Sequence, residues 1–114
     1  MKLQSSEIEN GIRLIQLIGA LDVTGSYIIE VEFVRECAGA NVRVIVDLSK
    51  VSYLSSVGIP MLTNTAKSVA SHGGKMVLFN PQRSVAEVLD IVGIHQIIPV
   101  FHDLDSAKAS LLAT

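Results

Sequence analysis

Cysteine is almost absent from this sequence of 114 residues: Cys37 stands alone, so no internal disulfide can form. Small secreted domains often depend on several disulfides, which makes that class a poor match. Tryptophan is missing, and two Tyr and three Phe are the whole aromatic content. The core is therefore expected to be aliphatic, with Cys37 packed inertly against it.

Long runs of one kind of residue are also absent. Nine basic and eleven acidic residues are interspersed, for a net charge of −2, so no basic face predicts a nucleic-acid partner. The polar N-terminus "MKLQSSEIENG" has no secretion-signal pattern, and the apolar runs are far too short to span a membrane. These absences favour a cytoplasmic protein with neither a nucleic-acid nor a membrane partner.

What the sequence does contain is an alternation of strand-like and helix-like segments. Strands are predicted within residues 1–8, 12–19, 42–49, 75–80 and 96–101, and helices within 27–37, 58–74, 82–93 and 103–114. The pair Asn10-Gly11 is a strong turn signal, so the first two strands are expected to form a hairpin. The order predicts one α/β domain over residues 1–114, with a mixed, mainly parallel sheet of about five strands and about four helices.

The two helices in the middle of the chain differ in how clearly their sequences predict them. The segment 58–74 carries apolar residues at 59, 62, 66 and 69, the spacing of one buried helix face. The segment 27–37 is rich in β-branched residues that also suit a strand. Apolar residues at 27, 31, 34 and 38 nevertheless form a helical stripe, with Asp22 and Thr24 or Ser26 available as caps. We therefore predict a helix there that buries this stripe.

The stretch "DLSKVSYLSSVGIPML" places two serines between a strand and a helix. Pro60 has no backbone N–H and is tolerated only near a helix start, so the helix should begin at about residues 56–58. On one interpretation, Ser55 or Ser56 simply caps the helix, which contributes about 1 kcal/mol. On the other, the positive helix end accommodates a phosphate on serine, and Gly58 leaves room for a close approach. A phosphate there would change recognition by a partner without unfolding the domain.

The same stretch resembles the signature of the STAS domain, the fold of sulfate transporters and anti-sigma factor antagonists. Members typically read D-L-S-x-V-x-[FY]-[ILM]-D-S-[ST]-G-[LI]-x-x-L at this place. The segments "LIGALD" and "SHGGKMVLFNPQRSVAEVLDIVGI" resemble two further family stretches in the same order, so the resemblance covers most of the chain. It implies a mixed sheet with helices over one side.

The resemblance also implies a function, anti-sigma factor antagonism. The unphosphorylated domain would bind an anti-sigma factor that is itself a serine kinase of the GHKL ATPase type, which frees a sigma factor. The kinase would phosphorylate the serine that aligns with Ser56, and a serine phosphatase would reverse the reaction. The implied partner-binding surface comprises Asp22, Thr24, Ser55, Ser56, Val57, Gly58, Ile59 and Met61.

Two positions depart from the family pattern. Ser55 stands where the family usually has Asp, and Val57 stands where it usually has Ser or Thr. Ser55 thereby becomes an alternative site of phosphorylation. The departures also keep open a second function, that of an unphosphorylated STAS scaffold or a regulatory subunit of a larger signalling assembly.

An enzyme is the competing class. A nucleophilic serine needs a base within hydrogen-bond reach, but His72 falls about 20 Å along the helix that Ser56 begins. His95 and His102 flank the last strand, and the sequence contains no G-x-S-x-G elbow, Walker motif or metal-ligand spacing. We expect no catalysis, no metal and no cofactor.

Overall fold

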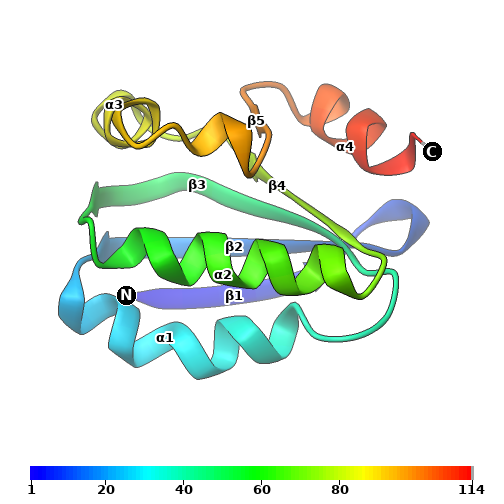
Figure 1. Cartoon of the computed structure of the whole chain (residues 1–114), viewed down its shortest axis with the longest axis horizontal. Coiled ribbons are helices and arrows are strands. Elements are labelled where there is room, and N and C mark those ends of the chain that lie inside the picture. The colour runs from blue at the N-terminus through cyan, green and yellow to red at the C-terminus, as the bar shows by residue number, and fades with distance from the viewer. Residues whose placement is uncertain (114) are drawn as a thin grey trace.

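The structure is a computed structural model that describes residues 1–113. Its strands are β1 (Lys2–Glu7), β2 (Ile12–Leu21), β3 (Arg43–Leu54), β4 (Lys75–Phe79) and β5 (Val100–Phe101), and its helices are α1 (Val23–Glu36), α2 (Gly58–Ser71), α3 (Arg83–Ile91) and α4 (Leu104–Leu112). Short 3-10 turns cover Glu9–Gly11 and Ile94–Gln96. The predicted α/β fold, with a mixed sheet of five strands and four helices, is confirmed (Figure 1).

The strands lie in the sheet in the order β1-β2-β3-β4-β5. As predicted, β1 and β2 form an antiparallel hairpin, and Asn10 and Gly11 close its turn with φ values of 61° and 71°. These left-handed values suit Asn and Gly, which explains their place there. The other neighbouring pairs are parallel, so each needs a crossover helix.

The helices cover both faces of the sheet, and not one side as the family resemblance implied. Successive side chains of a strand point to opposite faces, and Val44 and Val46 of β3 belong to the apolar cluster beneath α1, α2 and α3. Ile45 belongs instead to a second cluster with Ala107 and Leu111 of α4. Because the parallel strands follow one another in one direction, crossovers of one hand place α1, α2 and α3 on one face. Only α4 follows the last strand and is free to cover the other.

β3 is longer than predicted, because it extends past residue 49 to Leu54. Its pairing with β2 shifts register twice, between Gln16 and Ile18 and between Gly19 and Ala20, which marks bulges. Beside the first shift lies Asp47, 6% exposed, whose carboxylate accepts hydrogen bonds from Gln16 Nε2 at 3.1 Å and from the Ser49 amide at 2.9 Å. The strand therefore continues through the irregularity and ends next to the two serines.

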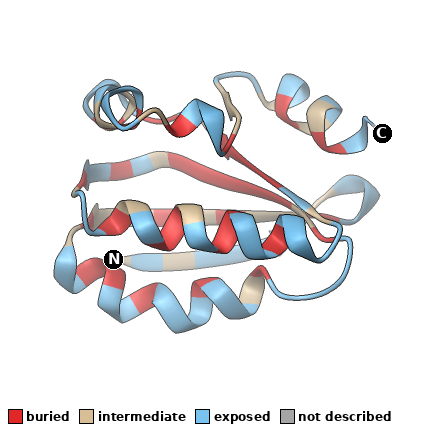
Figure 2. Cartoon of the chain, in the orientation of Figure 1, coloured by how far each residue is buried: buried red, intermediate tan, exposed pale blue. Residues whose placement is uncertain are grey.

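The predicted face of α2 is confirmed, whereas the predicted face of α1 is wrong. In α2, the predicted stripe packs on the sheet, with Leu62 and Val69 buried. In α1, the stripe at 27, 31, 34 and 38 is exposed, and Tyr27 is 85% exposed. Ile29 and Phe33 are buried in its place. Exposed residues make up most of α1, with buried ones between them (Figure 2).

The reason for this face of α1 lies at its first turn. An added Cβ on Gly25 would come within 2.1 Å of the Ala20 carbonyl oxygen, so only glycine fits against the end of β2. Gly25, Ile29 and Phe33 follow one another at intervals of four residues and therefore share a helix face. The close approach at Gly25 turns that face toward the sheet.

Cys37 follows α1 and is 3% exposed, which confirms that it is packed. Burial raises the pKa of its thiol from 9.0 to about 12. The nucleophilic form of cysteine is the thiolate, so this residue is chemically inert at neutral pH.

Candidate functional site

The site forms where two parallel strands end. Leu21, the last residue of β2, pairs with Leu54, the last residue of β3. The starts of α1 and α2 therefore lie side by side at one edge of the sheet (Figure 1). Because Asp22 and Ser55 each follow one residue of this pair, the loop at Asp22 lies next to the turn that carries the two serines.

Ser55 connects the end of β2 to the start of α2. Its amide and its hydroxyl both donate to the Leu21 carbonyl, at 3.0 and 3.2 Å. Its own carbonyl and Oγ accept from the Gly58 amide, at 3.0 and 3.4 Å. Ser55 is half-buried and is the serine that holds the helix start in place.

Ser56 is exposed in the turn between β3 and α2. Within residues 1–113 its hydroxyl makes no hydrogen bond, so it is free for modification or for a partner. α2 begins at Gly58, which confirms the predicted start, and Pro60 is its third residue. A helix start carries about half a positive charge and unpaired N–H groups, so Ser56 lies where an anion is stabilised.

Gly58 serves packing rather than access. An added Cβ there would lie 2.8 Å from Leu21 Cγ and 2.9 Å from the Leu21 carbonyl oxygen. The space that we predicted for a close approach is thus already filled by β2. Gly58 is buried for this reason.

The other residues of the predicted partner-binding surface differ in how far they are exposed. Thr24 and Val57 are exposed, whereas Asp22 and Ile59 are half-buried and Met61 is buried. The Asp22 carboxylate accepts from the Gly25 amide at 2.7 Å and so caps α1, as predicted. The exposed part of the predicted surface therefore centres on Thr24, Ser56 and Val57.

A hollow of about 490 Å³ lies beside Ser56, between the first turns of α1 and α2. Val23, Tyr27 and Glu30 of α1 line one side, and Ser56, Val57 and Asn64 line the other. Sequence reasoning missed Tyr27, Glu30 and Asn64. The stripe at 27, 31 and 34 was the available signal, but we assigned that stripe to the core.

Ser26 also lines this hollow and is 7% exposed. Its Oγ is buried and finds no hydrogen-bond partner within residues 1–113. A buried hydroxyl without a partner costs on the order of 1–3 kcal/mol. The unsatisfied hydroxyl therefore lies beneath the surface that Ser56 borders.

The histidines lie away from the serines. His72 follows α2, where its Nδ1 lies 2.7 Å from the Ser68 carbonyl oxygen, and His95 Nε2 lies 2.7 Å from Asp90 Oδ1. No base in residues 1–113 is hydrogen-bonded to the Ser56 hydroxyl, and no cluster of His, Cys, Asp or Glu in this part of the chain is arranged to hold a metal. The same residues contain no helix long and apolar enough to cross a membrane.

The exposed Ser56 hydroxyl thus lies just before the start of α2, on a domain built of one five-stranded mixed sheet and four helices. The family model of the STAS domain matches residues 4–107, and the chain belongs to this family.

Two named relatives are similar over most of the chain. BtrV of Bordetella bronchiseptica, named as a candidate anti-sigma factor antagonist, is 29% identical over 96% of this chain and 94% of its own length. The anti-sigma-B factor antagonist of Bacillus subtilis is 30% identical over 81% of this chain and 83% of its own length.

Solved structures share the fold. The unphosphorylated form of SpoIIAA, an anti-sigma factor antagonist, superposes with a TM-score of 0.75 over 99% of each chain, at 16% identity. The phosphorylated form of SpoIIAA, a Bacillus cell fate determinant, superposes with a TM-score of 0.66 over 96% of this chain and 99% of that one, also at 16% identity.

Proposed function

We propose that this chain is an anti-sigma factor antagonist, which binds an anti-sigma factor and thereby frees a sigma factor for transcription. The observation that carries the proposal is the exposed Ser56 hydroxyl at the start of α2. The names of both relatives support it, since each describes an antagonist of this kind. The role is one of binding, without catalysis, and its setting is the cytoplasm, with neither nucleic acid nor membrane as a direct partner.

The anti-sigma factor is proposed to be a serine kinase of the GHKL ATPase type that phosphorylates Ser56, and a serine phosphatase reverses the modification. Ser56 is favoured over Ser55 because the Ser55 hydroxyl is half-buried and bonded to the Leu21 carbonyl. A kinase must reach the hydroxyl that it modifies, and Ser56 alone of the pair offers a free one. That SpoIIAA exists in both phosphorylation states supports a switch in this fold.

The proposed partner surface follows from the exposure of its residues. Thr24, Ser56 and Val57 contact the partner directly, while the half-buried Asp22, Ser55 and Ile59 form its margin. Gly58 and Met61 support the surface from beneath.

Phosphate at Ser56 adds about two negative charges to this surface. The phosphate would lie at the hollow that Val23 and Val57 also line, so it would be costly to desolvate against an apolar partner group. We expect a loss of several kcal/mol in binding free energy.

The test mixes the protein with candidate GHKL-type anti-sigma kinases and ATP, followed by mapping of phosphate by mass spectrometry. Phosphate is expected on Ser56, lost in Ser56→Ala and retained in Ser55→Ala. Ser56→Asp should weaken binding of the kinase while the unfolding midpoint stays within about 2 °C.

The alternative function, an unphosphorylated scaffold or regulatory subunit, makes a different prediction. The replacement of the family's Ser or Thr by Val57, which is 50% exposed, favours it by adding apolar surface beside Ser56. A large multimer by sedimentation, with no phosphate on either serine in the presence of every kinase, would replace the antagonist role with this one.

A further inference from the structure

The hollow beside Ser56 is one end of a longer groove between α1 and α2. A second hollow of about 310 Å³ lies between the same helices and reaches His72 at the far end of α2. Glu30, Met61 and Asn64 line both hollows, so the two lie next to each other along the helix pair. We call this surface the α1/α2 groove; it runs beside two helices of 14 residues, or about 21 Å.

The α1 side of the α1/α2 groove is apolar and unusually exposed. Val23 and Tyr27 line the hollow next to Ser56, at 62% and 85% exposure, and Val34 lines the other, at 48%. The α2 side carries the short polar side chains of Asn64 and Ser68. Apolar residues that recur along one wall of a groove between two helices suit the ridge of a third helix.

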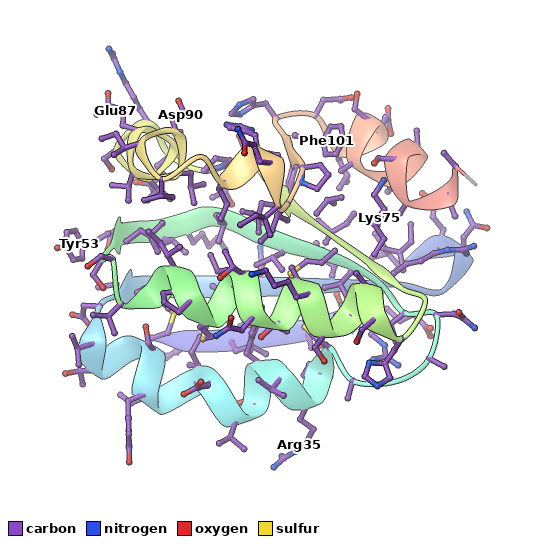
Figure 3. All side chains as sticks on the ribbon, in the orientation of Figure 1. Arg35, Tyr53, Lys75, Glu87, Asp90 and Phe101 are labelled. Carbon is purple, nitrogen blue, oxygen red and sulfur yellow. The ribbon has the colours of Figure 1, made fainter. Side chains whose placement is uncertain are left out.

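A single carboxylate interrupts this surface. Glu30 lines both hollows, and it takes part in none of the ion pairs found in residues 1–113. No Lys or Arg lines either hollow, and Arg35, on the same helix, points away from α2 (Figure 3). An occupant of the groove therefore needs a basic group near its middle to match Glu30.

We propose that the α1/α2 groove binds an amphipathic helix of the anti-sigma factor, whose apolar stripe carries one Arg or Lys opposite Glu30. This rests on the proposed function and names the part of the partner that recognises the chain. The groove ends at Ser56, so a helix bound along it lies beside that hydroxyl and leaves it open to the kinase, and a phosphate there meets the end of the bound helix. A second copy that paired symmetrically about the middle of the groove would bring Glu30 against Glu30, and this repulsion disfavours that pairing.

The role of the Glu30 charge is tested with two variants of α1, each of which replaces one glutamate by arginine. Glu30→Arg is compared with Glu32→Arg, which is also exposed but lines neither hollow. The probe is the GHKL-type kinase that phosphorylates Ser56 in the test above, and its affinity is measured by calorimetry without ATP turnover. Glu30→Arg should weaken binding by at least about 10-fold, and Glu32→Arg by less than about two-fold.

The apolar side is tested in the same way. Tyr27→Ser removes a groove residue, whereas Ile28→Ser removes an apolar residue that is 62% exposed but lies outside the groove. Tyr27→Ser should weaken binding of the kinase by about 10-fold and Ile28→Ser by less than about two-fold. All four positions are exposed, so the unfolding midpoints should remain close to that of the wild type.

A kinase in which one basic residue of the bound helix is replaced by Glu should again bind the Glu30→Arg variant. If the kinase phosphorylates Ser56 but binds Glu30→Arg and Glu32→Arg equally well, the groove is not its docking site, while the proposed function stands. If no kinase of the panel binds the wild type, both proposals fail. A dimer of the free protein that Tyr27→Ser dissociates would show a second copy in the groove and overturn this inference.

Discussion

α1 and α2 are both 14 residues long, both follow a strand of the parallel sheet, and both pack on the same face. Their sequences nevertheless predict their buried faces with different success. The principal apolar stripe of α2 is the one that packs on the sheet. α1 carries two apolar stripes, and the one with the regular heptad-like spacing is exposed. Helical periodicity therefore predicts a buried face only where a single stripe exists.

The two helices also begin differently, although each starts against the end of β2. α1 is capped by the Asp22 side chain, which accepts from the Gly25 amide at 2.7 Å. α2 is held by the backbone and side chain of Ser55, and the next residue is left exposed. α1 thus provides a tightly closed start, whereas α2 provides a start that displays a hydroxyl.

The largest effect should come from the face of α1 that the structure buries. Phe33→Ala, at 0% exposure, should lower the free energy of unfolding by about 3–5 kcal/mol, because it leaves a cavity in the core. Tyr27→Ala, on the exposed stripe, should change it by less than about 0.5 kcal/mol. Urea denaturation of both variants measures the difference. Similar losses at the two positions would mean that the assignment of faces is wrong.

Cys37 reports on the same face by its reactivity. At pH 8, the rise in its pKa from 9.0 to about 12 should lower the thiolate fraction about 1000-fold relative to the unfolded chain. Labelling with a chromogenic disulfide should be correspondingly slow in the native protein and fast in urea. Because burial favours the protonated thiol, its contribution to stability is complete below pH 9 and is lost as the pH rises toward 12. Rapid native labelling at pH 8 would contradict the packing of α1.

The glycines in the first turns of the two helices should differ in how strongly a substitution by Ala destabilises the protein. A Cβ added to Gly25 would lie 2.1 Å from the Ala20 carbonyl oxygen, and a Cβ added to Gly58 would lie 2.8 Å from Leu21 Cγ. Both Ala variants should be destabilised, by about 1–3 kcal/mol at Gly58 and by more at Gly25, because the contact with a backbone oxygen is much closer at Gly25, 2.1 Å against 2.9 Å at Gly58. Thermal unfolding of the two variants gives the order, and the reverse order would show that the backbone at Gly25 adapts.

The smallest effect should distinguish the two caps. Asp22→Ala should cost about 1 kcal/mol, because it removes a short hydrogen bond to the Gly25 amide. Ser55→Ala should cost about 0.5 kcal/mol, since its carbonyl still accepts from the Gly58 amide at 3.0 Å. Chemical denaturation of each variant provides the measurement. An equal or larger loss at Ser55 would indicate that its side chain, and not its backbone, holds the start of α2.

Much of the fold and the centre of the site could be predicted from local signals. Asn10-Gly11 marked the hairpin turn, and Pro60 placed the start of α2 within the range that the structure shows. The bulge in β3 and the position of α4 could not be predicted, because they depend on pairing with β2 and on packing across the sheet. The last strand was predicted over residues 96–101 but is reduced to Val100–Phe101: the 3-10 turn that ends at Gln96 and the irregular residues 97–99 take the place of its first part.

The roles of the site residues were also predictable only in part from the sequence. Sequence alone placed Ser55 and Ser56 at a helix start, yet their division into a structural and a free hydroxyl depends on the Leu21 carbonyl, which belongs to another strand. Tyr27 belongs to the apolar stripe that we assigned to the core, and Glu30 carried no signal of its own. They became part of a groove only because α2 lies beside them.

By itself, the sequence determined the order of strands and helices, the aliphatic core and the position of two serines where a strand gives way to a helix. These features follow from hydrophobic spacing and turn chemistry, which act over a few residues. Only the tertiary structure decided which side of α1 faces the sheet and which serine stays free. Those choices rest on contacts with β2, in particular on the close approach at Gly25 and on the Leu21 carbonyl, between residues that local patterns do not connect.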